Sequence, residues 1–214
     1  MKKQDPRYKN TFFSTQSLTT YMADYANALS KAYQELDQKS CQKFVDEIES
    51  AITEGRTVFS CGNGGSASIA DQMATDWGKG IFMENFCQPR IISLSANNSS
   101  ITAYGNDLGY EFIFSEQLKM LGKSGDVYLA ISSSGNSPNV IQGAKTAIAM
   151  GMKTLSLTGF SGGMLKEISD ICIHVPHHNY GIAEDCHQGI MHLTAQYLFL
   201  RFQEKQESKF SKVG

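Results

Sequence analysis

The chain lacks a charge excess of either sign and has no apolar run long enough for a membrane span. Its 214 residues carry 19 basic and 21 acidic side chains, for a formal net charge of -2. A general nucleic-acid-binding protein carries a basic excess instead. The apolar runs are strand-sized and fall short of the roughly 18 to 20 residues of a transmembrane helix. We therefore expect no direct binding of nucleic acid and no membrane segment.

Paired cysteines and a readable targeting segment are also missing. The five cysteines are odd in number and widely spaced, and no Cys-x-x-Cys pair occurs. The charged segment from Met1 to Lys9 is not followed by the apolar stretch of a signal peptide. Reduced thiols and a cytoplasmic location are the expectation. With 41% hydrophobic and 19% charged residues, the composition is that of a folded chain, not a disordered one.

The length and the pattern of apolar residues predict one domain. We expect a loose arm over residues 1–15, a single domain over 16–205 and a polar tail over 206–214. Apolar residues recur at steps of three and four from about Ser17 to Leu36, and again from Phe44 to Ile52, with Gly55 as a helix stop. Such a helix pair covers a sheet face or packs on another subunit, and the pattern leaves both open.

Five short β-prone segments follow, and helical stretches separate them. Their alternation predicts βαβ units and a parallel sheet, and the nearly continuous apolar strands predict a sheet covered on both faces. The last apolar pattern, from Ile182 to about Phe202, predicts one long helix. The predicted strands are 57–61, 90–95, 126–131, 153–158 and 170–175, and the helices between them are 66–78, 112–121, 137–150 and 161–168.

Glycine and serine gather where the predicted strands end. They follow the first strand over Gly62–Ser68, the third over Ser132–Ser137 and the fourth over Thr158–Gly163. Glycine lets the backbone approach a ligand, helix N-termini offer free N–H groups, and serine adds neutral donors. Together they predict a cradle for a phosphate monoester without lysine or arginine. The alternative is that these residues only end strands and cap helices.

The loops after the first and third predicted strands lack the sequence patterns of nucleotide-binding sites. No G-x-x-x-x-G-K-[ST] motif is present, and the segment from Gly62 to Ser68 lacks the final spacing of the dinucleotide fingerprint. No acidic residue stands out about 20 positions further on, where that fingerprint places one. A nucleotide cofactor is therefore not expected.

Two sets of side chains spaced four residues apart, here called ladders, contain the candidate acid–base groups. Gln72 and Asp76 share one face of the helix after the first loop, and Glu184, Gln188 and His192 share a face of the last helix. A carboxylate with an imidazole is a natural pair for moving protons between neighbouring atoms. The alternatives are that Asp76 is a surface acid and that His192 belongs to a packing face.

The segment from Cys61 to Ser66, together with that from Ile131 to Asn139, resembles a sugar isomerase (SIS) domain. The stretch from Tyr104 to Tyr110 narrows the resemblance to the phosphoheptose isomerase branch, and the likeness covers roughly residues 20–200. The resemblance implies a three-layer αβα sandwich with a five-stranded parallel sheet, extra N-terminal helices and a long C-terminal helix. It also implies a homotetramer with active sites at subunit interfaces.

The reaction that the resemblance implies is an aldose–ketose isomerisation. Sedoheptulose 7-phosphate would become D-glycero-D-manno-heptose 7-phosphate through an enediol, for the heptose of lipopolysaccharide or capsule. By the same resemblance Asp76 and His192 carry the acid–base work, and Asn97 faces the sugar. The full set of expected substrate and phosphate positions is Asn63, Gly64, Ser66, Asn97, Ser132, Ser133, Ser134 and Ser137.

The resemblance also implies a metal site, at positions where the sequence departs from the family pattern. Positions matching Gln72, Asp76, Glu184 and His192 surround zinc in some members. The family often has His, Glu and Gln at the first three. An amide oxygen is a poor zinc ligand beside imidazole. Two carboxylates and one imidazole still suffice for a three-ligand site, so zinc or another divalent ion stays open.

Two other functions are also compatible with the sequence. One is an isomerase for another sugar phosphate, which differs in the size of its pocket. The other is a non-catalytic SIS tetramer that binds a phosphosugar and acts through a protein partner, such as the replication initiator. Asp76 and His192 favour an enzyme, whereas Gln72 slightly favours the binding protein.

Overall fold

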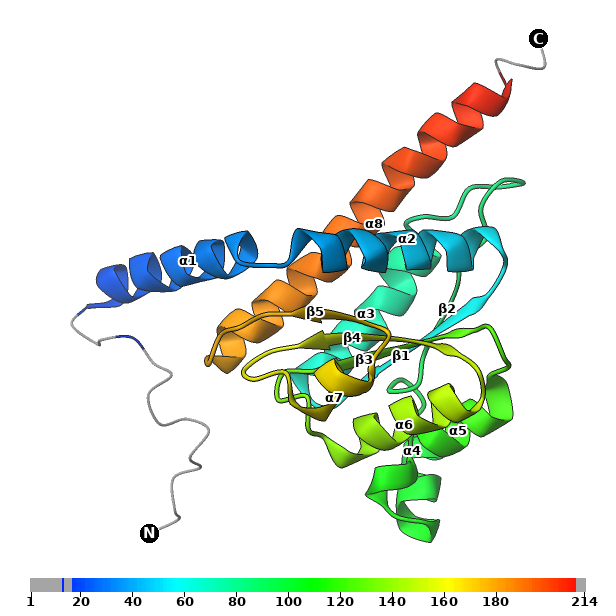
Figure 1. Cartoon of the computed structure of the whole chain (residues 1–214), viewed down its shortest axis with the longest axis horizontal. Helices are drawn as coiled ribbons and strands as arrows, with labels where there is room; N and C mark the ends of the chain where they lie inside the picture. Colours follow the sequence, from blue (N-terminus) through cyan, green and yellow to red (C-terminus); the bar gives the residue numbers. More distant parts are fainter. Residues whose placement is uncertain (1–12, 14–16, 211–214) are drawn as a thin grey trace.

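The computed structural model describes residue 13 and residues 17–210 of the chain (Figure 1). Most of the predicted N-terminal arm, and residues 211–214 of the predicted tail, lie outside the described residues. The two predicted N-terminal helices are present as α1 (Leu18–Gln34) and α2 (Gln38–Thr53). Both begin at a capping side chain, since Ser17 accepts a hydrogen bond from the Thr20 amide and Asp37 from the Ser40 amide.

A five-stranded parallel sheet forms the centre of the molecule, as the sequence predicts. The strand order is β2-β1-β3-β4-β5, and every neighbouring pair is parallel. The strands are β1 (Thr57–Gly62), β2 (Arg90–Ser93), β3 (Val127–Ser132), β4 (Lys153–Thr158) and β5 (Ile171–His174).

Six further α-helices connect and follow the strands. They are α3 (Gly65–Gly78), α4 (Asn98–Asp107), α5 (Ser115–Leu121), α6 (Pro138–Ala149), α7 (Gly163–Ile168) and α8 (Tyr180–Phe210), with the 3₁₀ turn η2 (Tyr110–Phe112).

Two of these helices differ from the sequence prediction. The helix α4 was not predicted, and since it buries no residue it has no apolar stripe to reveal it. The helix α8 continues to Phe210, whereas the apolar pattern ends near Phe202. The added residues are mostly Gln, Glu and Lys, which favour helix without apolar contacts.

The sheet lies between two helical layers, which confirms the predicted three-layer sandwich (Figure 1). Alternate residues of β3 face opposite layers, as a pleated strand requires. Val127 and Leu129 belong to the core shared with α2, α3 and α8, and Tyr128 and Ala130 to the core shared with α5 and α6. A sheet buried on both faces leaves its strand ends as the place for a ligand.

The helix α1 extends away from the sandwich (Figure 1). It packs against α8, but Ala32 is its one buried residue among those the structure describes. Leu18 and Met22, part of its predicted apolar stripe, are 75% and 62% exposed. Within residues 17–210 no helix is both long and apolar enough to cross a lipid bilayer.

Candidate active site

The glycine- and serine-rich loops after β1 and β3 lie side by side. In the sheet order, β2 lies on one side of β1 and β3 on the other, so the chain reverses direction across the sheet there. Such a switch point leaves a crevice at the carboxyl ends of the two strands. The amides of Asn63 and Asn139 join the loops, because each donates to the side-chain oxygen of the other at 2.8 Å.

Two glycines in these loops are there for conformational reasons. Gly64 has a φ of +54° before α3, a conformation that side-chain-bearing residues rarely adopt. Gly135 has a φ of +65°, and a Cβ atom there would lie 1.8 Å from the carbonyl oxygen of Gly162. The amide of Gly159 donates to the carbonyl of Ser133 at 2.9 Å. The loops after β3 and β4 therefore pack backbone against backbone.

The predicted phosphate-binding serines lie in this loop with different surroundings. The hydroxyls of Ser132 and Ser137 are 3.2 Å apart, and that of Ser134 accepts from the Asn136 amide at 3.2 Å. The Ser133 hydroxyl is buried and has no hydrogen-bond partner. Ser66 is buried in the first turn of α3. The structure thus brings the expected cradle residues to one edge of the sheet, and phosphate binding stays a prediction.

Two side chains near the cradle have contacts that the sequence did not reveal. Tyr110, 58% exposed, donates its hydroxyl to the side-chain oxygen of Asn63 at 3.2 Å. The buried Asn139 forms hydrogen bonds with the same Asn63 amide. Both are far from Asn63 in sequence, so only the fold could bring them together. Asn97 caps α4 through the Ser100 amide at 3.0 Å, and its expected sugar contact stays a prediction.

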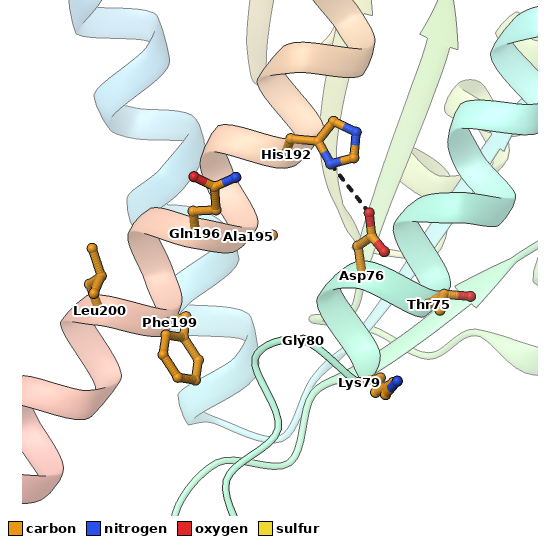
Figure 2. Close-up of a pocket in the computed structure, with 9 residues that line it drawn as sticks. All are labelled: Thr75, Asp76, Lys79, Gly80, His192, Ala195, Gln196, Phe199 and Leu200. Carbon is orange, nitrogen blue, oxygen red and sulfur yellow. Dashed lines mark ion pairs between the residues drawn. The ribbon is translucent and has the colours of Figure 1, made fainter.

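The two four-residue ladders face each other, because α3 and α8 run side by side in the same direction. Asp76 meets His192, with 3.3 Å between Oδ2 and Nδ1 (Figure 2). One turn earlier, Gln188 Nε2 donates to Gln72 Oε1 at 2.8 Å. The side chains of His192 and Asp76 remain 44% and 31% exposed. An imidazole and a carboxylate in contact, and open to solvent, can exchange protons with a ligand.

Hydrogen bonds along each helix connect these two contacts between the helices. The four side chains thus form a closed ring of contacts: Gln72, Asp76, His192 and Gln188. Gln72 Nε2 donates to Asp76 Oδ2 at 3.2 Å. Gln188 Nε2 lies 3.0 Å from His192 Nε2. The amide of Gln188 therefore contacts both the opposite helix and the imidazole. Gln188 was part of the predicted ladder, but no role could be predicted for it.

Glu184 lies near the start of the α3–α8 contact, away from the rung of Asp76 and His192. A Cβ atom on Gly65 would lie 2.6 Å from Glu184 Oε2, so this carboxyl group packs against the first residue of α3. Burial, and then the neighbouring Asp185, raises the pKa of Glu184 above its usual value.

The four positions expected to hold a metal do not form a ligand set. In the described part of the chain, no group of three or more His, Cys, Asp and Glu side chains is placed to hold a metal ion. Asp76 and His192 are in contact, Gln72 joins them through its amide, and the Glu184 carboxyl group lies beside Gly65. The donors present at the ring are one carboxylate, one imidazole and two amides, which do not fit a zinc site.

An open pocket of about 660 Å³ begins at Asp76 and His192 (Figure 2). It extends toward the C-terminal ends of α3 and α8, away from the serine loop. Phe199 and Leu200 form an apolar wall, and Lys79 is the one basic side chain among its lining residues. The full lining is Thr75, Asp76, Lys79, Gly80, His192, Ala195, Gln196, Phe199 and Leu200.

Comparison with known proteins agrees with this architecture. A parallel αβα sandwich with small-residue loops at the ends of β1 and β3 is the arrangement of a sugar isomerase domain, and the family model for the SIS domain matches residues 20–159. The phosphoheptose isomerase of Cytophaga hutchinsonii is 42% identical over 160 residues, which cover 74% of this chain and 83% of that relative. That of Helicobacter pylori is 36% identical, covering 85% and 93%.

Solved structures extend the likeness to 84 to 87% of the chain. The phosphoheptose isomerase of Neisseria gonorrhoeae superposes with a TM-score of 0.76 at 30% identity, covering 84% of this chain and 95% of that one. The structure from Francisella tularensis gives 0.75 at 27% identity, covering 87% and 98%. The chain belongs to the SIS domain family, in its phosphoheptose isomerase branch.

Proposed function

We propose that the chain interconverts sedoheptulose 7-phosphate and D-glycero-D-manno-heptose 7-phosphate, an aldose–ketose isomerisation. The observation that carries the proposal is the contact of Asp76 with His192 at the mouth of an open pocket. Relatives at 36 to 42% identity are named phosphoheptose isomerases, which favours an enzyme over a non-catalytic binding protein.

The reaction moves a carbonyl group between C1 and C2 of the sugar. One group must take a proton from carbon and return it to the neighbouring carbon, while another moves protons between the two oxygens. Asp76 and His192 share this acid–base work. The Asp76–His192 contact uses the oxygen Oδ2, which also accepts from Gln72, so Oδ1 is the oxygen left to face a substrate. Neutral N–H donors nearby can stabilise the enediolate.

The phosphate would bind at the cradle between β1 and β3. The residues we assign to it are Asn63, Gly64, Ser66, Ser132, Ser133, Ser134 and Ser137, with Asn97 toward the sugar. Uncharged hydroxyls and helix N-termini suit a phosphate monoester. The buried, unpartnered hydroxyl of Ser133 supports this assignment, because a buried polar group calls for a partner.

The proposed assembly is a homotetramer whose sites lie at subunit interfaces. The cradle adjoins Gly65 and the acid–base pair includes Asp76, and eleven residues of α3 separate them by about 16 Å along the helix axis. The pocket beside Asp76 does not include the serine loop. Both observations support a site completed by a second copy of the chain. A cytoplasmic location and a role in lipopolysaccharide or capsule heptose synthesis complete the proposal.

Proton NMR in D₂O tests the activity directly. With sedoheptulose 7-phosphate, we expect new anomeric signals and deuterium at C2 of the aldose, because an enediol exchanges its proton with solvent. Replacing either acid–base group, as Asp76→Asn or His192→Gln, should lower kcat by about 10²- to 10⁴-fold.

The controls are Asp46→Asn and His178→Gln, which change exposed residues outside the motifs and should keep full turnover. Full turnover in Asp76→Asn or His192→Gln would overturn the catalytic assignment. Turnover of a shorter ketose phosphate in preference to the heptose would shift the proposal to another sugar-phosphate isomerase.

A further inference from the structure

The ring at Asp76 and His192 has a defined direction of hydrogen bonding. A carboxylate only accepts hydrogen bonds, so the Gln72 atom beside Asp76 must be its amide nitrogen. The Gln72 oxygen then faces Gln188, which must present its own nitrogen there. Because that nitrogen also lies 3.0 Å from His192 Nε2, the imidazole accepts at Nε2. A neutral His192 therefore carries its proton on Nδ1, the atom that faces Asp76.

Three atoms of this ring that could bind a metal, on Asp76, Gln72 and His192, already have an N–H partner or neighbour. Asp76 Oδ2 accepts from Gln72 and lies 3.3 Å from His192 Nδ1. Gln72 Oε1 and His192 Nε2 both face the Gln188 amide nitrogen, at 2.8 and 3.0 Å. The two hydrogens of one NH₂ group thus point at the two atoms that a cation would join. A metal ion joining the two helices at these atoms would need their lone pairs free.

We propose that the Gln188 amide takes the place of a metal ion, bridging α3 and α8 and holding His192 in its Nδ1–H tautomer. Gln188 is then a positioning residue that acts through His192 and Gln72. Both ring nitrogens of His192 then have a partner, so His192 acts in proton transfer through its contact with Asp76. The inference deepens the proposed function and rests on it for this role. The bridge itself rests on the three amide contacts alone.

Gln188→Glu is the sharpest test, because it exchanges one NH₂ group for an oxygen at nearly constant shape. The variant gains a carboxylate beside Asp76 and His192, which together make two carboxylates and an imidazole. We expect the wild-type chain, stripped with chelator and then offered zinc, to retain far less than one equivalent after gel filtration. Gln188→Glu should retain close to one and bind zinc at least about 100-fold more tightly, as measured by calorimetry.

The matched control is Gln203→Glu, an exposed glutamine on the same helix, which should bind no more zinc than the wild type. A second variant, Gln188→Leu, removes the donor without adding a ligand. Nitrogen-correlated NMR of the His192 ring should show one tautomer in the wild type and a mixture of two in Gln188→Leu. A merely structural glutamine would not change that tautomer ratio.

Stoichiometric zinc in the wild type, or a single unchanged tautomer in Gln188→Leu, would overturn the proposal. Neither zinc retention nor the His192 tautomer ratio depends on turnover. The Gln188 bridge and the proposed function can therefore be rejected independently of each other. A chain that isomerises no sugar phosphate but behaves as expected in both tests would retain the Gln188 bridge and lose the proposed function. If Gln188→Leu does not fold, as judged by circular dichroism, the zinc comparison with Gln188→Glu decides the matter.

Discussion

At the scale of single residues, His187 is a buried group with a consequence for stability. It is fully buried on α8, and neither ring nitrogen has a hydrogen-bond partner. Burial lowers the pKa of His187 from 6.5 to about 4, because the charged ring is poorly solvated there. Between these two values the unfolded chain binds a proton that the folded chain does not. The free energy of unfolding should therefore rise as the pH rises from about 4 to 6.5.

The variant His187→Leu tests this dependence. Leucine fills a similar volume and has no titrating ring. Across this pH window, the free energy of unfolding of the variant should therefore change by up to about 3 kcal/mol less than that of the wild type. Urea unfolding at a series of pH values measures the difference. The exposed His178→Leu serves as control and should keep the wild-type slope. An unchanged slope in His187→Leu would show that other groups cause the acid sensitivity.

Other residue-scale features could be read from the sequence only in part. The spacing of Asp76 from Gln72 and of His192 from Gln188 predicted two faces of two helices, and the structure confirms each face. That the two faces meet is a tertiary fact, since 116 residues separate Gln72 from Gln188.

At the scale of elements, the packing of α1 on α8 depends on a glycine. A Cβ atom on Gly189 would lie 1.6 Å from the hydroxyl oxygen of Tyr33. That hydroxyl donates to backbone carbonyls of α8, at 3.3 Å to Asp185 and 3.4 Å to Cys186. Tyr25 adds a hydrogen bond of 2.6 Å to the Asp185 carboxylate. The absence of a side chain at Gly189 therefore lets α1 approach.

The variant Gly189→Ala should displace α1 and lower the stability by about 1 to 3 kcal/mol, because the tyrosine ring has to move. Hydrogen exchange should increase over α1 and remain unchanged in the sheet. Gly78→Ala is the matched control, since a Cβ atom there meets nothing within 4 Å and alanine favours helix. That variant should be as stable as the wild type or more so. Unchanged exchange over α1 in Gly189→Ala would contradict the role of the Tyr33 contact.

The sequence predicted most elements well, and the failures have a common cause. The strongly amphipathic α2 and the apolar strands were recognised because they bury side chains at a regular period. The helix α4 buries none, and the last turns of α8 lie beyond the apolar pattern. Elements formed by propensity and capping alone give no period to detect.

At the scale of the whole molecule, the exposed apolar side chains support an assembly. Leu18 and Met22 on α1 and Tyr197 and Leu200 on α8 are 46 to 75% exposed. Exposed apolar side chains that the described residues do not cover are typical of a protein interface. It fits the alternative, left open by the sequence pattern, that the N-terminal helices pack on another subunit.

Mixing two inactive variants tests whether copies share a site. Asp76→Asn removes the acid, and Ser134→Asp places a negative charge in the phosphate cradle. If each site takes its cradle from one copy and its acid from another, hybrids of the two variants contain some intact sites. We expect the mixture, after unfolding and refolding together, to regain activity that neither variant has alone. Light scattering should show a tetramer throughout.

The control is the double variant carrying both changes on one chain, refolded with wild type, which measures dilution alone. If the mixture of the two single variants forms tetramers but regains no activity, the cradle and the acid of each site belong to the same copy. A monomer by light scattering would reject the assembly itself.

The class of fold and the chemical groups of the candidate site could be predicted from the sequence. The order of strands, loops and helices, the small residues at strand ends and the helical spacing are local properties. Local properties can be recognised from neighbouring residues in the sequence. The contacts of these groups could not be predicted in the same way: Tyr110 and Asn139 lie around Asn63, Gln188 lies between Gln72 and His192, and Glu184 lies beside Gly65. These contacts join elements far apart in sequence, and their geometry depends on how α3, α8 and the sheet pack together.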